Sequence, residues 1–279
     1  MSAKWLLGMA VDEAAPDHST LTKFKERIEK QGKEALLEKS LQEAVMMAMG
    51  TGVALGSIQV VDSTHTLADV NVSKDDRRRA QGQPPRDGGA RWGVKRKRGG
   101  KRGGKEDSKP HYFYGYKMHT SMNAASDMIT SLVVTGGNAN DGKQFPTLVK
   151  KDRQQALPVD IYAADRGYDD SENHYLPQHL GMHSAILLNR YRTEKKNKNK
   201  EVWIELKRTQ EYRAGKKERY KIERKFGEAK TNHGLRRCRS VGRLRYAIQA
   251  YLTAIVLNLK RMVKLLTGAS FKGRARAMA

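Results

Sequence analysis

Apolar positions along the chain follow two different periods. Some segments repeat apolar residues three and four positions apart or begin with capping residues, which predicts helices over residues 1–50, 143–151, 171–181, 217–233 and 241–266. Others are short apolar runs rich in β-branched and aromatic residues, which predicts buried strands over residues 57–62, 113–122, 128–135, 159–164 and 183–188. This succession of elements predicts an α/β fold in which a mixed sheet is flanked by helices.

Two of the predicted strands run into an aspartate. The apolar run 159–164 is followed by Asp165, and an earlier run ends at Asp62. Open α/β sheets bind ligands beyond the carboxyl ends of their strands, so both aspartates are predicted to lie at a functional edge of the sheet. The alternative for each is that it only caps the following turn.

A third acidic residue, Glu223, lies in the helix predicted over residues 217–233. Arg219 precedes it by four positions and Lys230 follows it by seven, so the three side chains are expected on one helical face. Carboxylates held on two strand ends and one helix are the oxygen ligands that a pair of Mg²⁺ ions requires. The sequence therefore predicts a metal site formed by Glu223 and the two aspartates.

Charge indicates the class of partner. The formal net charge is +24, which makes a polyanion the expected partner, because each Lys or Arg that neutralises a phosphate releases a counterion. No uninterrupted apolar run approaches the roughly 20 residues of a membrane-spanning helix, and the first residues do not have the layout of a signal peptide. Cys238 is the single cysteine, which excludes an internal disulfide. We therefore expect a cytoplasmic protein that binds nucleic acid and no membrane.

Basic segments interrupt the predicted elements. Residues 74–109 contain 14 Lys and Arg against 5 Asp and Glu, together with Gly-Gly pairs, which predicts a flexible loop that either follows phosphates or is simply solvated. Residues 189–215 form a lysine-rich insertion around Trp203, which can stack on a flipped base or form a small core of its own. The predicted division is a helical region at 1–54, which either contacts DNA or braces the next domain, an α/β domain at 55–268 and a basic tail at 269–279.

Several parts of the sequence resemble the DDE transposases of bacterial insertion sequences. They are residues 16–21 (PDHSTL), 62–65 (DSTH), 115–119 (GYKMH), 164–169 (ADRGYD) and 223–227 (ERKFG), with Lys230 and His233. Together they are spread over most of the chain, from residue 16 to residue 233, and are highly specific to the group with the Tyr-x2-Arg-x3-Glu-x6-Lys signature. Arg219, Glu223 and Lys230 match this signature, and Lys216 stands at its tyrosine position.

The resemblance implies a ribonuclease-H-like catalytic domain and a metal-dependent reaction. It implies that Asp62, Asp165 and Glu223 are catalytic and hold two Mg²⁺ ions, for which Mn²⁺ substitutes, with Asp62 bridging both. The implied activity is cleavage of double-stranded DNA at the ends of an element and transfer of the freed 3′-hydroxyl to target DNA. A homodimer on DNA, associated with the bacterial nucleoid, is the expected assembly. Family members usually carry more helical sequence before residue 16, so this chain is expected to be a shortened form.

Six further residues are candidates for contacts with DNA. They are Arg219, Lys230, Arg166, Tyr168, His65 and His119. For the two signature residues the alternative is an ordinary ion pair on a solvated helix. For Arg166 and Tyr168 the alternative is that they only build the turn after Asp165. For the histidines it is a structural hydrogen bond, which is the commoner role of a lone histidine.

Two other functions remain open at this point. A catalytically silent DNA-binding protein derived from a transposase would keep the fold and the charge, and the intact set of three acids argues against it. A nuclease of the same fold acting on RNA–DNA hybrids is disfavoured by the signature around Glu223.

Overall fold

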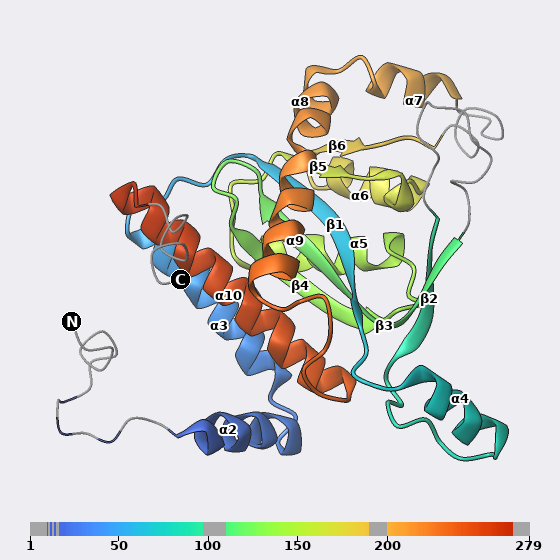
Figure 1. Cartoon of the computed structure of the whole chain (residues 1–279). Coiled ribbons are helices and arrows are strands. Elements are labelled where there is room, and N and C mark those ends of the chain that lie inside the picture. The colour runs from blue at the N-terminus through green and yellow to red at the C-terminus, as the bar shows by residue number, and fades with distance from the viewer. Residues whose placement is uncertain are drawn as a thin grey trace, which may run out of the picture.

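A mixed β-sheet forms the centre of the protein (Figure 1). The computed structural model describes residues 17–96, 110–189 and 200–269, with Ala10, Asp12 and Ala14. Its strands are β1 (Ile58–Leu67), β2 (Arg91–Arg96), β3 (Pro110–Asn123), β4 (Ile129–Gly136), β5 (Ile161–Ala164) and β6 (His183–Ile186). In these ranges the sheet has six strands in the order β2-β3-β1-β5-β6, and β4 also pairs with β3. β1 pairs antiparallel with β3 and parallel with β5. This mixed sheet confirms the predicted fold class and is consistent with the ribonuclease-H-like fold.

Helices cover both faces of the sheet. They are α2 (His18–Lys30), α3 (Glu34–Gly50), α4 (Val72–Ala80), α5 (Phe145–Gln154), α6 (Ser171–His179), α7 (Lys200–Leu206), α8 (Gln210–Glu218), α9 (Tyr220–Asn232) and α10 (Arg243–Thr267). Successive strand residues point to opposite faces. Val60 and Ala163 therefore pack in the core formed with α3, α8, α9 and α10. Val61 and Ala164 pack in the core formed with α5 and α6.

Helix α10 packs along α3 and beside β4 (Figure 1). Its buried residues are Tyr246, Ala247, Ile248, Ala250, Tyr251, Thr253, Ala254, Leu257 and Asn258. Only part of the apolar face expected from the sequence is buried, because Val256, Leu259 and Val263 are exposed. Asn258 accepts a hydrogen bond of 2.8 Å from the backbone N–H of Ile129 and donates one of 2.7 Å to its carbonyl. The side chain thus satisfies backbone groups of β4. Gly268 ends the helix at a φ of 68°, as predicted.

The basic segment 74–109 is not wholly a loop, contrary to the prediction. It contains most of α4 and all of β2, and its residues 97–109 lie outside the described part of the chain. Polar contacts fold this segment, because the buried carboxylates of Asp75 and Asp87 accept hydrogen bonds from its backbone N–H groups. Such contacts can order a chain that has little apolar surface to bury.

Two predicted boundaries are also wrong. β1 does not stop at Asp62 but continues to Leu67, because this part of the strand pairs with β3. The helix predicted over residues 217–233 is two helices, α8 and α9, which meet at Arg219. Because β2 precedes β3, Asp165 follows the fifth strand of the chain and not the fourth.

The predicted insertion at 189–215 contains α7 and part of α8. Its residues 190–199 lie outside the described part of the chain, as do the side chain of Trp203 and residues 270–279 of the predicted tail. Within the described ranges, no helix is long and apolar enough to cross a membrane.

Candidate active site

Asp62 and Asp165 lie next to each other where β1 and β5 stop pairing. The parallel register aligns Val61 with Ala164, and each aspartate is the next residue along its chain segment. Val60 packs on the face covered by α8 and α9, and side chains alternate along extended backbone, so Asp62 points to that same face. The structure therefore brings together the two aspartates that the sequence places at strand ends.

Burial and neighbouring charges raise the pKa of both aspartates. Burial, and then the nearby carboxylate of Asp165, raise the pKa of Asp62 from 3.8 to about 7, although the Ser63 N–H donates a 2.8 Å hydrogen bond to it. Burial also raises the pKa of Asp165, although Gly167 donates a 2.7 Å hydrogen bond to its Oδ1. A buried carboxylate beside a second one favours a bound proton or cation.

Glu223 lies beside this pair, in the first turn of α9. Its carboxylate accepts a 3.1 Å hydrogen bond from Arg219 and is 57% exposed. The negative charge of Glu223 contributes to the raised pKa of Asp165, whereas the positive charge of Arg219 lowers the pKa values of Asp165 and Asp62. Across the described ranges, no three His, Cys, Asp or Glu side chains are close enough together to hold a metal ion. The two aspartates are thus adjacent, and Glu223 stands near them in an ion pair with Arg219.

Two of the candidate DNA contacts lie around this group. Arg166 is exposed in the turn that follows Asp165. Lys230 is partly buried in the last turn of α9, seven residues after Glu223 and so about 10 Å further along the helix axis.

Tyr168 lies in the core and not at the surface. Its side chain is fully buried, and its ring packs edge-on at 6.2 Å from the ring of Phe145 in α5. The pKa of Tyr168 is raised by burial and then by the charge of Asp62. The burial of Tyr168 favours the alternative that the sequence allowed, in which this residue builds the turn after Asp165.

The two histidines also have structural environments. The ring of His65 lies 4.5 Å from the ring of Phe113. His119 is fully buried, and its Nε2 lies 2.8 Å from the hydroxyl of Thr135. Burial lowers the pKa of His119 to about 4, so its ring is neutral at pH 7.

Asp141 is a further acidic residue at this edge, in a segment whose Gly and Asn residues predict only a turn. Its Oδ1 accepts a 2.9 Å hydrogen bond from Lys117. Its negative charge contributes to the raised pKa values of both Asp62 and Asp165. The sequence could have indicated a site residue here, because the aspartate comes shortly after strand β4, but the surrounding Asn and Gly residues favoured a turn. The site thus contains one more carboxylate than the sequence predicted.

Comparison with known proteins identifies the family. Residues 55–259 match the model of the transposase DDE domain family. The chain is also 29% identical over 246 residues to the transposase for insertion sequence element IS1106 of Neisseria meningitidis serogroup B, over 86% of this chain and 72% of that protein. The family match covers more than half of the chain and includes both aspartates and Glu223. The chain therefore belongs to the transposases with a DDE domain.

Proposed function

We propose that this transposase cleaves the ends of an insertion element and joins the freed 3′-hydroxyl to target DNA in a metal-dependent reaction. The observation that carries the proposal is the adjacency of Asp62 and Asp165, with the raised pKa of Asp62, inside the region that matches the family. In this proposal Asp62, Asp165 and Glu223 are the catalytic residues.

The donor set fits divalent cations. Asp62 and Asp165 offer hard oxygen ligands, and their mutual repulsion is relieved when a cation binds between them. Glu223 would complete the site after exchanging its ion pair with Arg219 for the cation, which its exposed position allows. Bound Mg²⁺, or Mn²⁺ in its place, supplies activation of water and stabilisation of the leaving 3′-oxygen.

Backbone groups of this chain would hold the carboxylates in place, and its basic side chains would hold the DNA phosphates. The N–H groups of Ser63 and Gly167 fix the carboxylates of Asp62 and Asp165 by direct hydrogen bonds. Arg219 is positioned to contact a phosphate once Glu223 leaves it, and a guanidinium matches phosphate oxygens well. Lys230 and Arg166 would contact phosphates further from the cleaved bond. Joining two element ends calls for a homodimer on DNA.

A catalytically silent DNA-binding protein is the second candidate. The observation in its favour is that Glu223 is held by Arg219 and does not form a three-carboxylate cluster with the aspartates. In that case the protein would bind DNA both in Mg²⁺ and in EDTA and would never cleave it.

A strand-cleavage and strand-transfer assay tests the proposal. The substrate is duplex DNA that carries the element's own ends, with and without Mg²⁺. Asp165→Asn should lower the cleavage rate about 1000-fold, because metal ions supply several kcal/mol of transition-state stabilisation. Asp160→Asn is the matched control, since Asp160 is exposed just before β5 and five residues from Asp165. Equal rates for both variants would remove the catalytic assignment.

A further inference from the structure

A basic groove of about 500 Å³ lies between α9 and α10. Residues 221, 224, 225 and 228 line it from α9, and residues 257, 260, 261 and 264 line it from α10. Both sets have the spacing of a single helical face. Glu223 differs from residue 224 by about 100° around the helix and from residue 225 by about 200°. The charged residues that α9 contributes to the α9–α10 groove therefore point away from Glu223, and Gly227, four residues after Glu223, is the lining residue of α9 nearest to its face.

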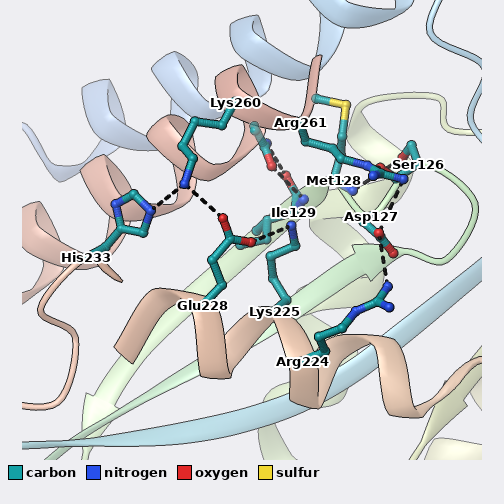
Figure 2. Close-up of polar contacts among 11 residues, drawn as sticks. Ser126, Asp127, Met128, Ile129, Arg224, Lys225, Glu228, His233, Lys260 and Arg261 are labelled. Carbon is teal, nitrogen blue, oxygen red and sulfur yellow. Dashed lines mark hydrogen bonds and ion pairs between the residues drawn. The ribbon is translucent and has the colours of Figure 1, made fainter. Parts of the chain in front are cut away.

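Asp127 links the two helices at one end of the groove. It lies in the turn between β3 and β4, and its carboxylate is 11% exposed. It forms ion pairs with Arg224 of α9 at 3.4 Å and with Arg261 of α10 at 3.3 Å, as Figure 2 shows. Arg261 also donates a 2.7 Å hydrogen bond to the carbonyl of Ser126. One carboxylate thus orients two guanidinium groups, one from each helix.

Glu228 repeats this arrangement with two lysines. It forms ion pairs with Lys225 of α9 at 3.4 Å and with Lys260 of α10 at 3.0 Å (Figure 2). Lys260 also lies 3.2 Å from the Nε2 of His233. Burial lowers the pKa of Lys225, and the charge of Glu228 offsets this effect only in part. The second carboxylate therefore also holds one cation from each helix.

The two carboxylates position these cations but neutralise only half of their charge. Four basic side chains face two acidic ones, and Lys264 adds further positive charge to the lining, whereas Lys221 is paired with Glu218. The ammonium group of Lys264 forms no ion pair with any residue in the described ranges. The side chain of Arg224 is 63% exposed, so it remains accessible to a ligand in spite of Asp127. Basic side chains that are held in place and carry an excess of positive charge form a preorganised site for a polyanion.

We propose that the α9–α10 groove binds the phosphate backbone of duplex DNA at a site separate from the two aspartates. This inference rests on the proposed function, since it assumes that the polyanion is DNA. Phosphate oxygens accept the hydrogen bonds that guanidinium and ammonium groups donate. A second hollow of about 260 Å³ shares Asn232 with the groove and adds Lys25, Arg239 and Arg245, of which Arg245 is paired with Glu29 at 2.8 Å. The basic surface therefore continues along α10, as a duplex backbone requires. DNA in the groove would lie about one helix diameter, roughly 10 Å, from Glu223.

The experiment measures how DNA binding depends on salt. Arg224→Gln with Lys264→Gln removes two exposed cations of the groove. Lys150→Gln with Arg153→Gln is the matched control, because it removes one lysine and one arginine that are exposed on α5. Fluorescence anisotropy with a labelled duplex of about 30 base pairs is recorded in EDTA between roughly 50 and 200 mM salt. Melting curves of all variants verify that they are folded.

Loss of two phosphate contacts should lower the slope of log Kd against log salt by about 1.8 for the groove variant, and weaken binding about ten- to a hundredfold. The control should keep the native slope. Equal slopes for the two variants would overturn the inference. Polyglutamate that competes with the labelled duplex as strongly as unlabelled DNA does would also overturn it, because the ligand would then be an acidic protein. Binding in EDTA does not require cleavage. If the native protein never cleaves DNA but the groove variant changes the slope, only the proposed function is contradicted. If the native protein cleaves DNA normally but the groove variant leaves the slope unchanged, only DNA binding in the groove is contradicted.

Discussion

Arg219 donates a 3.1 Å hydrogen bond to Glu223 one helical turn away, and its charge also lowers the pKa values of Asp62 and Asp165. One guanidinium group therefore interacts electrostatically with three carboxylates. It does not compensate for burial and for the charge of Asp165, which together raise the pKa of Asp62 to about 7. A site with this imbalance should respond to added cations in stability as well as in activity.

Divalent metal should raise the melting temperature. A ligand present at about 100 times its Kd stabilises the folded state by about 2.7 kcal/mol, and for a chain of this size each kcal/mol raises the melting temperature by about 2 to 4 °C. Differential scanning fluorimetry with millimolar Mg²⁺ or Mn²⁺ measures this shift. Asp62→Asn should abolish it and Asp160→Asn should retain it. An unchanged melting temperature in the native protein would contradict binding at the aspartates.

Asp141→Asn should weaken metal binding without abolishing cleavage. The carboxylate contributes negative charge to Asp62 and Asp165 while it is held by Lys117. Removing such a supporting group typically weakens metal affinity by about 10 to 100-fold. The Mg²⁺ concentration at half-maximal cleavage should rise by this factor, with little change in the rate at saturating Mg²⁺. A lower rate that excess Mg²⁺ does not restore would show that Asp141 acts on the reaction itself.

The contrast between Asp165 and Asp141 shows what the sequence can predict. Asp62 and Asp165 each follow an apolar run, so their meeting follows from parallel pairing of two strands. The position of Asp141 depends on a loop that folds back toward Lys117, and no local pattern reports that contact. Tyr168 is similar, because its burial depends on Phe145 from another helix.

The fold shows the same limit. The hydrophobic period predicts α10 and the buried strands, since apolar burial determines both. It fails for α4 and β2, which are held by the buried carboxylates of Asp75 and Asp87. The spacing of apolar residues does not predict polar contacts between segments that are distant in sequence.

Asp152 should give the metal-free protein a characteristic pH dependence. It is fully buried, and burial raises its pKa to about 6, although Ser121 and Thr130 donate hydrogen bonds to it. Between about pH 4 and 6 the folded state then binds more protons than the unfolded state, so this group's contribution to stability is lost as the pH rises through that window.

Urea denaturation at several pH values in EDTA measures the effect of Asp152. The free energy of unfolding should fall more steeply with pH between about 4 and 6 for the native protein than for Asp152→Asn, which cannot titrate. The comparison uses slopes, because the substitution also changes the hydrogen bonds. Equal slopes for the two proteins would show that Asp152 is already ionised in the folded state below this window.

Gly215→Ala should destabilise the protein although alanine is the better helix former. Gly215 lies in α8, and an added Cβ would lie 3.2 Å from the Cβ of Ala163 and closer still to that of Ala185. The contact forces α8 away from β5 and β6, and overpacking of this kind costs about 1 to 3 kcal/mol. Because α8 leads directly to Arg219, the same shift should lower cleavage even at temperatures where the variant is folded.

Gly227→Ala is the matched control, because Gly227 lies in α9 with no atom within 4 Å of its added Cβ. This substitution should stabilise the protein by about 1 kcal/mol, which is the difference in helix propensity between the two residues. Melting temperatures should therefore move in opposite directions for the two glycines. A higher melting temperature for Gly215→Ala would mean that α8 can move outward without loss of packing, and Arg219 would then not depend on this close approach.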